Sequence, residues 1–101
     1  MVPPMSDEDT FGLAPETVLS VNLRARVRRS ADGLWVGLGE SFFVLTGPAV
    51  QLWELIDGRA DLGGIAKAVA GQYGVADEVV LADAVETFTP LLAGGLLCVQ
   101  P

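Results

Sequence analysis

The chain has 101 residues, half of them hydrophobic, and it carries a net charge of −7 without a single histidine. This length predicts one domain with a core, and the acidic balance disfavours nucleic acid and anionic membranes as partners. The apolar stretches fall short of the ~18 residues of a transmembrane helix. The one cysteine, Cys98, cannot form an internal disulfide, so we expect a protein of the reducing cytoplasm.

The N-terminal segment, residues 1–17, contains prolines and acidic side chains and shows little periodicity. We expect it to be a disordered tail without a function of its own. It also lacks the basic and apolar regions of a secretory signal peptide. The predicted domain therefore comprises residues 18–101.

Residues 19–28 alternate between apolar and polar side chains, which predicts one half-buried antiparallel strand. Its apolar face would carry Val21, Leu23, Ala25 and Val27. Asp32-Gly33 predicts a tight hairpin turn, because both residues tolerate the backbone angles that such turns require. Two further strands are expected over residues 34–38 and 42–45. Short turns between the strands make a meander, so the third strand should lie at an edge of the sheet.

Three helices are predicted after the strands, each preceded by a residue that can cap it. The ranges are about Pro48–Ile56, Leu62–Gln72 and Glu78–Ala93, with the caps Thr46, Asp61 and Asp77 in that order. Gly74 should end the second helix, and Pro90 should kink the third or end it early because proline lacks a backbone donor. The apolar segment Leu96–Val99 is expected to pack on the sheet.

This order of elements predicts the α+β class. The expected architecture is winged helix-turn-helix-like, a three-stranded antiparallel sheet followed by three helices. Such a fold raises the question of DNA binding. The third predicted helix carries Asp77, Glu78, Asp83 and Glu86 and no basic residue, so it should repel DNA.

The residue types that most catalytic and metal sites need are missing. Without histidine, the chain lacks the commonest general base and metal ligand. Its glycines do not have the spacing of a phosphate-binding loop. Cys98 has no base partner nearby in the sequence, so we expect a buried structural cysteine. We therefore predict a protein that is not an enzyme and that has no cofactor, no metal site and no catalytic residue.

Two features stand out against this background. The basic cluster consists of Arg24, Arg26, Arg28 and Arg29, and its alternation favours a solvated strand face. Binding of an acidic peptide or partner is the alternative. The third predicted strand is apolar on both faces, so Phe42 and Val44 need a cover of their own if Phe43 and Leu45 point into the core. A bound peptide that adds a strand would supply that cover. The third helix or a partner subunit would also do so.

Residues 42–75 and 82–97 resemble the PqqD-like family, the RiPP recognition elements. The residues that carry the resemblance are Leu45, Gly47, Leu52-Trp53, Leu55-Ile56-Asp57-Gly58, Ile65-Ala66, Tyr73, Asp83 and Gly95-Leu96-Leu97. Three positions depart from the family's pattern. Thr46 replaces the usual asparagine, Thr87 stands where a large apolar residue is common, and Pro90 interrupts the last helix. These departures concern the groove beside that helix.

The resemblance implies a non-catalytic protein that binds the leader of a ribosomally made precursor peptide and presents it to a modifying enzyme. The leader would add as a strand in the cleft between the third strand and the third helix. Carried onto this sequence, the site comprises Ser41, Phe42, Phe43, Val44 and Leu45 on the strand and Val79, Val80, Asp83, Ala84, Glu86 and Thr87 on the helix. The partner enzyme would be a radical-SAM maturase, a lasso-peptide leader protease and cyclase, or a dehydratase.

The implied roles differ between these residues. Phe42, Val44 and Val80 would line pockets for apolar leader side chains, and one of the pair Val79 and Val80 should face the core. Asp83 and Glu86 would attract a basic leader residue. Trp53 and Leu55 are assigned to the core because apolar stripes on helices usually face it. Two alternatives stay open, a structural subunit whose strand completes a partner's sheet and a winged-helix regulator.

Overall fold

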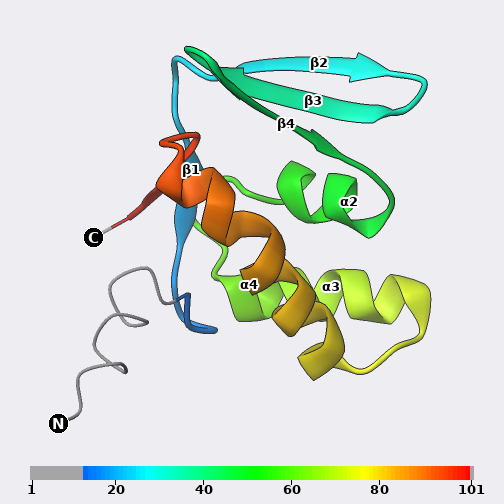
Figure 1. Cartoon of the computed structure of the whole chain (residues 1–101). Helices are drawn as coiled ribbons and strands as arrows, with labels where there is room; N and C mark the ends of the chain where they lie inside the picture. The colour runs from blue at the N-terminus through cyan, green and yellow to red at the C-terminus, as the bar shows by residue number, and fades with distance from the viewer. Residues whose placement is uncertain (1–12, 101) are drawn as a thin grey trace, which may run out of the picture.

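The structure is a computed structural model that describes residues 13–100. In this part of the chain there are five strands and three helices (Figure 1). In chain order these are β1 (Leu19–Val21), β2 (Arg26–Ser30), β3 (Gly33–Leu38), β4 (Ser41–Leu45), α2 (Pro48–Glu54), α3 (Leu62–Tyr73), α4 (Asp77–Ala93) and β5 (Leu97–Val99). The predicted α+β class, with an antiparallel three-stranded sheet and three helices, is confirmed.

The larger sheet has the strand order β2-β3-β4, and both neighbouring pairs are antiparallel. β4 therefore lies at an edge, as predicted. Glycine is required where β3 begins, because Gly33 has a φ of +145° and an added Cβ would lie 2.2 Å from the carbonyl oxygen of Leu45. The close approach of these two backbones fixes the position of the last residue of β4.

The single strand predicted over residues 19–28 is wrong. The chain forms β1 and β2 instead, and the break begins at Asn22, whose side-chain amide donates to the carbonyl of Gly95 (2.9 Å) and whose side-chain oxygen accepts from the N–H of Arg24 (2.8 Å). The resulting turn leaves Leu23 fully exposed, although the alternation placed it on the buried face. A local asparagine turn has thus overridden the strand pattern.

The C-terminal apolar segment does not pack on the larger sheet. It forms β5, which pairs antiparallel with β1 in a second, two-stranded sheet. Leu97 faces the core, whereas Cys98 points to the other side and is exposed. The prediction of a buried structural cysteine is therefore wrong, because the strand alternation turns that side chain outward.

The helix caps agree only in part with the sequence. Asp61 caps α3 as predicted, because its side chain accepts from the N–H of Gly64 (2.8 Å), and Gly74 ends that helix in the left-handed conformation. The predicted caps Thr46 and Asp77 are wrong. The N-cap of α2 is Gly47, and neither α2 nor α4 has a side-chain cap.

Two local geometries explain these differences. Thr46 uses its backbone carbonyl rather than its hydroxyl, accepting from the N–H of Ala49 (3.2 Å). Asp77 lies inside the first turn of α4, where its negative charge is favourable next to the positive end of the helix dipole. Pro90 does not end α4 early, because the helix continues to Ala93.

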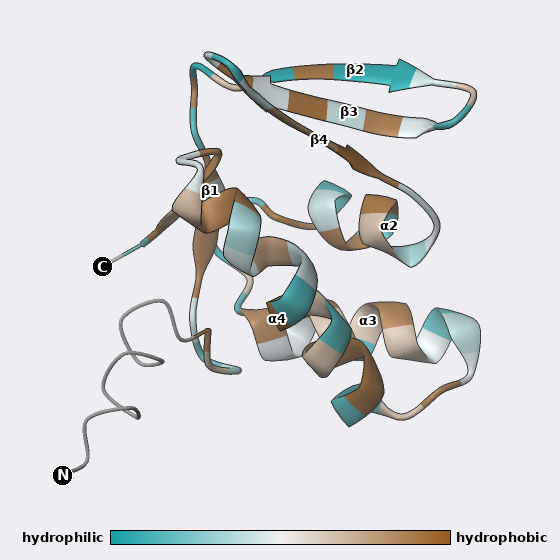
Figure 2. Cartoon of the chain, in the orientation of Figure 1, coloured by the Kyte–Doolittle hydropathy of each residue, from teal (hydrophilic) through white to brown (hydrophobic). Residues whose placement is uncertain are grey.

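The core lies between the helices and one face of the larger sheet (Figure 2). Leu34 and Val36 of β3 point into it together with Leu45 of β4. Trp53 is buried there as predicted, but Leu55 is exposed because α2 ends one residue earlier. The opposite face of the sheet points away from the helices (Figure 1).

The predicted tail differs from the structure in its last five residues, and residues 1–12 of it lie outside the described part. The carbonyl oxygens of Pro15 and Thr17 accept from the N–H groups of Gly63 (2.7 Å) and Leu62 (2.9 Å) at the start of α3. Helix N-termini leave such donors unpaired, so this segment completes α3. In residues 13–100, no helix has the length and apolar character needed to cross a membrane.

Candidate functional site

The candidate site begins at the open edge of β4. The loops joining β2 to β3 and β3 to β4 each have two residues, which places a hydrogen-bonded pair directly beside each loop. Hydrogen-bonded and non-hydrogen-bonded pairs alternate along an antiparallel ladder. Starting from the hydrogen-bonded Leu38–Ser41 pair, Phe43 and Leu45 therefore also form backbone hydrogen bonds to β3. The peptide N–H and C=O groups of Phe42 and Val44 therefore face the open edge.

The side chains of β4 alternate between the two faces of the sheet. Phe43 and Leu45 point toward the helices, and Leu45 is buried. Phe42 and Val44 point to the opposite face, where 60% and 43% of their surface is exposed. The prediction that these two residues lack cover from the core is confirmed. They point away from α4, so the structure does not bring them together with Val80 in one pocket.

The α4 side of the site contains an apolar pocket of about 160 Å³. Val79, Val80 and Asp83 line it from α4. Pro48 and Leu52 line it from α2, and Val69, Tyr73 and Val75 line it from α3 and the loop after it. Val80 is buried and Val79 is exposed, which confirms that one of the two faces the core. Pro48, three residues after the end of β4, is the lining residue nearest to that strand in the sequence.

The remaining candidates on α4 differ in how accessible they are. Ala84 has no exposed surface, so it belongs to the core and cannot contact a ligand. Thr87 is half-buried, and helical spacing places it on the same stripe as Asp83 and Gly94. That stripe faces β4 at its C-terminal end, since an added Cβ at Gly94 would lie 3.5 Å from the ring of Phe43. Glu86 is exposed beside this stripe.

The electrostatics of the site are set by α4, which carries acidic side chains and no basic one. Asp83 stands at the rim of the apolar pocket. In residues 13–100 the one ion pair joins Arg29 to Glu54, so neither Asp83 nor Glu86 is neutralised by a described residue. A basic side chain of a ligand would therefore be attracted to this rim.

Sequence reasoning missed most of the pocket wall. Tyr73, which entered the sequence analysis only as part of the family resemblance, is exposed at the pocket together with Val75. The available signal was Gly74, which ends α3 and leaves an aromatic and a branched apolar side chain on either side of a turn.

Comparisons with known proteins show which family the chain belongs to. The family model described as coenzyme PQQ synthesis protein D (PqqD) matches residues 13–97. The chain belongs to the PqqD family. A search of curated proteins found no match.

A solved structure has the same fold as this PqqD-family chain. It is the solution NMR structure of the PqqD truncation of Methylobacterium extorquens PqqCD, described as a functional and stand-alone RiPP recognition element. The TM-score is 0.77 at 21% sequence identity, and the alignment covers 89% of this chain and 98% of the other. At this identity the likeness establishes the fold.

Proposed function

We propose that this PqqD-family chain binds the leader segment of a ribosomally synthesised precursor peptide and presents it to a modifying enzyme. The observation that carries the proposal is the open edge of β4, where the peptide groups of Phe42 and Val44 are free to pair. An extended peptide that adds to such an edge gains affinity from backbone hydrogen bonds and specificity from alternate side chains. The solved PqqD structure supports the proposal, because it is described as a recognition element of this kind.

The leader would run along β4, from Ser41 to Leu45, on the side of α4. Its inward side chains would face the stripe of α4 that contains Asp83 and Thr87. Where the leader passes the end of β4, an apolar side chain would enter the pocket above Val80, with Val79 at its rim. The exposed carboxylates of Asp83 and Glu86 would attract a basic leader residue.

In this role the chain acts without catalysis, cofactor or metal, and the chemistry belongs to its partner. The partner enzyme would be a radical-SAM maturase, a lasso-peptide leader protease and cyclase, or a dehydratase. We place the encounter in the cytoplasm, where ribosomal precursors are made. DNA regulation is the weaker interpretation of the fold, because α4 presents Asp77, Glu78, Asp83 and Glu86 to any approaching phosphate.

The test is a fluorescence-anisotropy titration with the leader of the precursor gene that neighbours this chain's gene. Val44→Pro removes one N–H at the open edge without removing a hydrogen bond to β3. Val44→Thr is the matched control, because threonine has the same shape and keeps the N–H. We expect wild type and Val44→Thr to bind alike and Val44→Pro to bind at least ~10-fold more weakly.

Circular dichroism of both variants shows whether they fold. Equal binding by folded Val44→Pro would rule out strand addition at β4. No binding by the wild type, combined with co-purification in a fixed complex, would instead identify a structural subunit.

A further inference from the structure

The face of the larger sheet that points away from the helices has a composition of its own. Two cross-strand rows lie on it, Arg28–Trp35–Val44 and Arg26–Gly37–Phe42. Each row runs from an arginine on β2 to an apolar side chain on β4. We call this surface, made of these six residues, the outer face.

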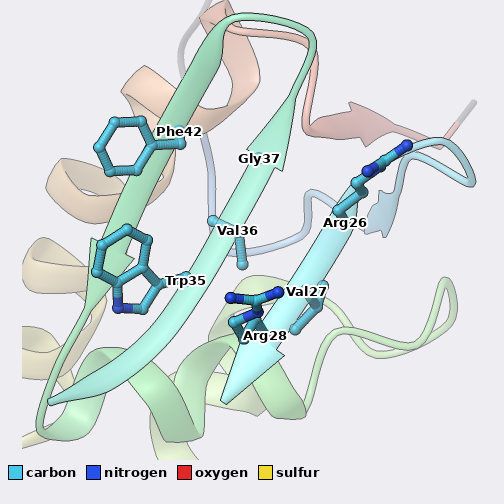
Figure 3. Close-up of a pocket in the computed structure, with 7 residues that line it drawn as sticks. All are labelled: Arg26, Val27, Arg28, Trp35, Val36, Gly37 and Phe42. Carbon is cyan, nitrogen blue, oxygen red and sulfur yellow. The ribbon is translucent and has the colours of Figure 1, made fainter. Parts of the chain in front are cut away.

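The apolar half of the outer face is contiguous and exposed. The rings of Trp35 and Phe42 stack with their centroids 5.4 Å apart and their planes 11° apart, side by side (Figure 3). Trp35 keeps 40% of its surface exposed, Phe42 60% and Val44 43%. Exposed aromatic patches of this kind are costly in water and mark contact sites, and tryptophan is enriched among the residues that dominate binding energy.

Glycine at position 37 gives this surface its shape. Because Gly37 has no side chain, the row between Arg26 and Phe42 contains a gap. Together with Arg28 and Trp35 these residues line an open hollow of about 390 Å³ (Figure 3). The hollow has an aromatic wall on one side and the two arginines of β2 on the other, where the guanidinium group of Arg28 lies over the sheet and that of Arg26 extends away from the rings (Figure 3). A single large apolar side chain would fit it.

The charge of the outer face is opposite to that of the whole protein. The chain has thirteen acidic and six basic residues, yet Arg26 and Arg28 are the charged groups of this surface. Neither forms an ion pair with any residue in the range 13–100. Arg29 lies between Arg28 and the turn, points to the opposite face and pairs with Glu54. The sheet therefore separates two unpaired arginines from a paired one.

We propose that the outer face is a second binding surface, which docks a protein segment that carries acidic side chains around an aromatic or branched aliphatic anchor. The anchor would fill the hollow over Gly37 against Trp35 and Phe42. The carboxylates would pair with Arg26 and Arg28, which is the charge complementarity that an otherwise acidic chain offers at this surface. The surface uses the side chains of Phe42 and Val44, whereas the open edge of β4 uses their peptide groups, so the proposal does not depend on leader binding.

Nucleic acid fits this surface less well. Stacking on Trp35 and Phe42 would suit unpaired bases, but continuous backbone contact needs a longer basic track than two arginines provide. The net charge of −7 would also oppose a polyanion. A protein segment with two or three carboxylates matches the charge of the two arginines. The apolar anchor between those carboxylates matches the hollow.

The test is an NMR titration of the ¹⁵N-labelled full chain with an acetylated, amidated nonapeptide of sequence DPFEPFDPF. Its prolines prevent pairing with the edge of β4. One control peptide replaces each acidic residue by lysine, a second replaces each phenylalanine by serine, and a ten-nucleotide thymidine oligonucleotide tests nucleic acid. We expect the acidic aromatic peptide to shift the resonances of Trp35, Gly37 and Phe42, including the indole N–H of Trp35, and both control peptides to bind at least ~10-fold more weakly.

Matched variants locate the binding. Arg28→Gln should weaken binding about threefold and the double variant with Arg26→Gln about tenfold. Arg29→Gln removes the same charge from the same strand on the opposite face and should change the affinity less than about twofold. Trp35→Thr keeps a strand-forming residue and should abolish binding, while the anisotropy titration with the leader stays unchanged.

Several results would overturn the proposal. If the lysine peptide bound as tightly as the acidic peptide, the proposed pairing of carboxylates with Arg26 and Arg28 would be wrong. If the oligonucleotide bound more tightly than either peptide, the surface would be a nucleic-acid site. Absence of shifts on the outer face at about 2 mM peptide would show that the surface is not a docking site of measurable strength. A dimer in sedimentation that Trp35→Thr dissociates would show instead that a second copy covers it.

Discussion

The approach of Gly33 to Leu45 allows a sharp test of how β4 is held. In Gly33→Ala the new Cβ would lie 2.2 Å from the Leu45 carbonyl oxygen, whereas Cβ contacts below 3.0 Å are essentially never seen. The carbonyl must move by most of an ångström, at the pair that joins the end of β4 to β3. The positive φ costs about 1–3 kcal/mol and the disturbed hydrogen bond about 1 kcal/mol. We therefore expect a loss of about 3 kcal/mol, less a few tenths for the reduced freedom of the unfolded chain.

Gly39→Ala is the matched control, because Gly39 also has a positive φ, of +60°, but nothing lies within 4 Å of an added Cβ. It should cost about 1 kcal/mol or less. Thermal unfolding followed by circular dichroism separates the two, because 1 kcal/mol shifts the Tm of a domain of this size by about 4–8 °C. Gly33→Ala should therefore lower the Tm by about 10–20 °C. Equal shifts in the two variants would refute the reasoning from close contact and leave backbone conformation as the whole cause.

Three further predictions concern carboxylate side chains. Asp61→Ala removes the side-chain cap of α3 and should cost about 1 kcal/mol in urea unfolding. Asp77→Ala removes no capping hydrogen bond, so it should lower the free energy of unfolding by less than Asp61→Ala does. A larger loss in Asp77→Ala than in Asp61→Ala would show that the caps are wrongly assigned. The backbone N–H groups of Ala60 and Arg59 hold the pKa of Asp57 below its ordinary value of 3.8. Its ionised form therefore stabilises the fold above that pH, and the effect is lost as the pH falls through the lower folded pKa. The Tm difference between wild type and Asp57→Ala should shrink in acid below about pH 4, and a constant difference would contradict this origin. Asp83→Asn combined with Glu86→Gln should weaken leader binding about three- to tenfold and flatten its dependence on salt. An unchanged affinity would falsify the role of these carboxylates in attracting the leader.

The parts of the fold that the sequence predicted are those set by local periodicity. The hairpin from β3 to β4, the two-faced character of β4 and the cap at Asp61 follow from side chains close together in the chain. Asn22 shows where this reasoning fails, because its bond to the distant Gly95 carbonyl interrupts a pattern that alternates perfectly. The pairing of β5 with β1 likewise joins segments far apart in the sequence and has no local signal.

The sequence predicted the candidate site only in part. Alternation identified Phe42 and Val44 as uncovered, but it does not tell which face of the sheet the helices occupy. The resemblance therefore placed both beside Val80, whereas the helices cover the opposite face. Ala84 was assigned to the site from its position in the family pattern, although it lies on the buried stripe of α4. Deciding which of two helix stripes is buried requires the packing partner, which sequence periodicity does not provide.

The alternation of β4 also constrains any peptide that pairs with its edge. Side chains of an added strand must follow the same period of two, so every second one points toward α4 and the others extend the outer face beyond Phe42 and Val44. Alternate side chains of such a peptide therefore meet different surroundings, with α4 on one side of the sheet and solvent on the other. A shift of one residue along the edge would exchange the two sets completely. In the proposed complex, a leader whose side chains match the α4 side would be held in a single register, and this register would set the distance from the bound segment to the part of the precursor that is modified.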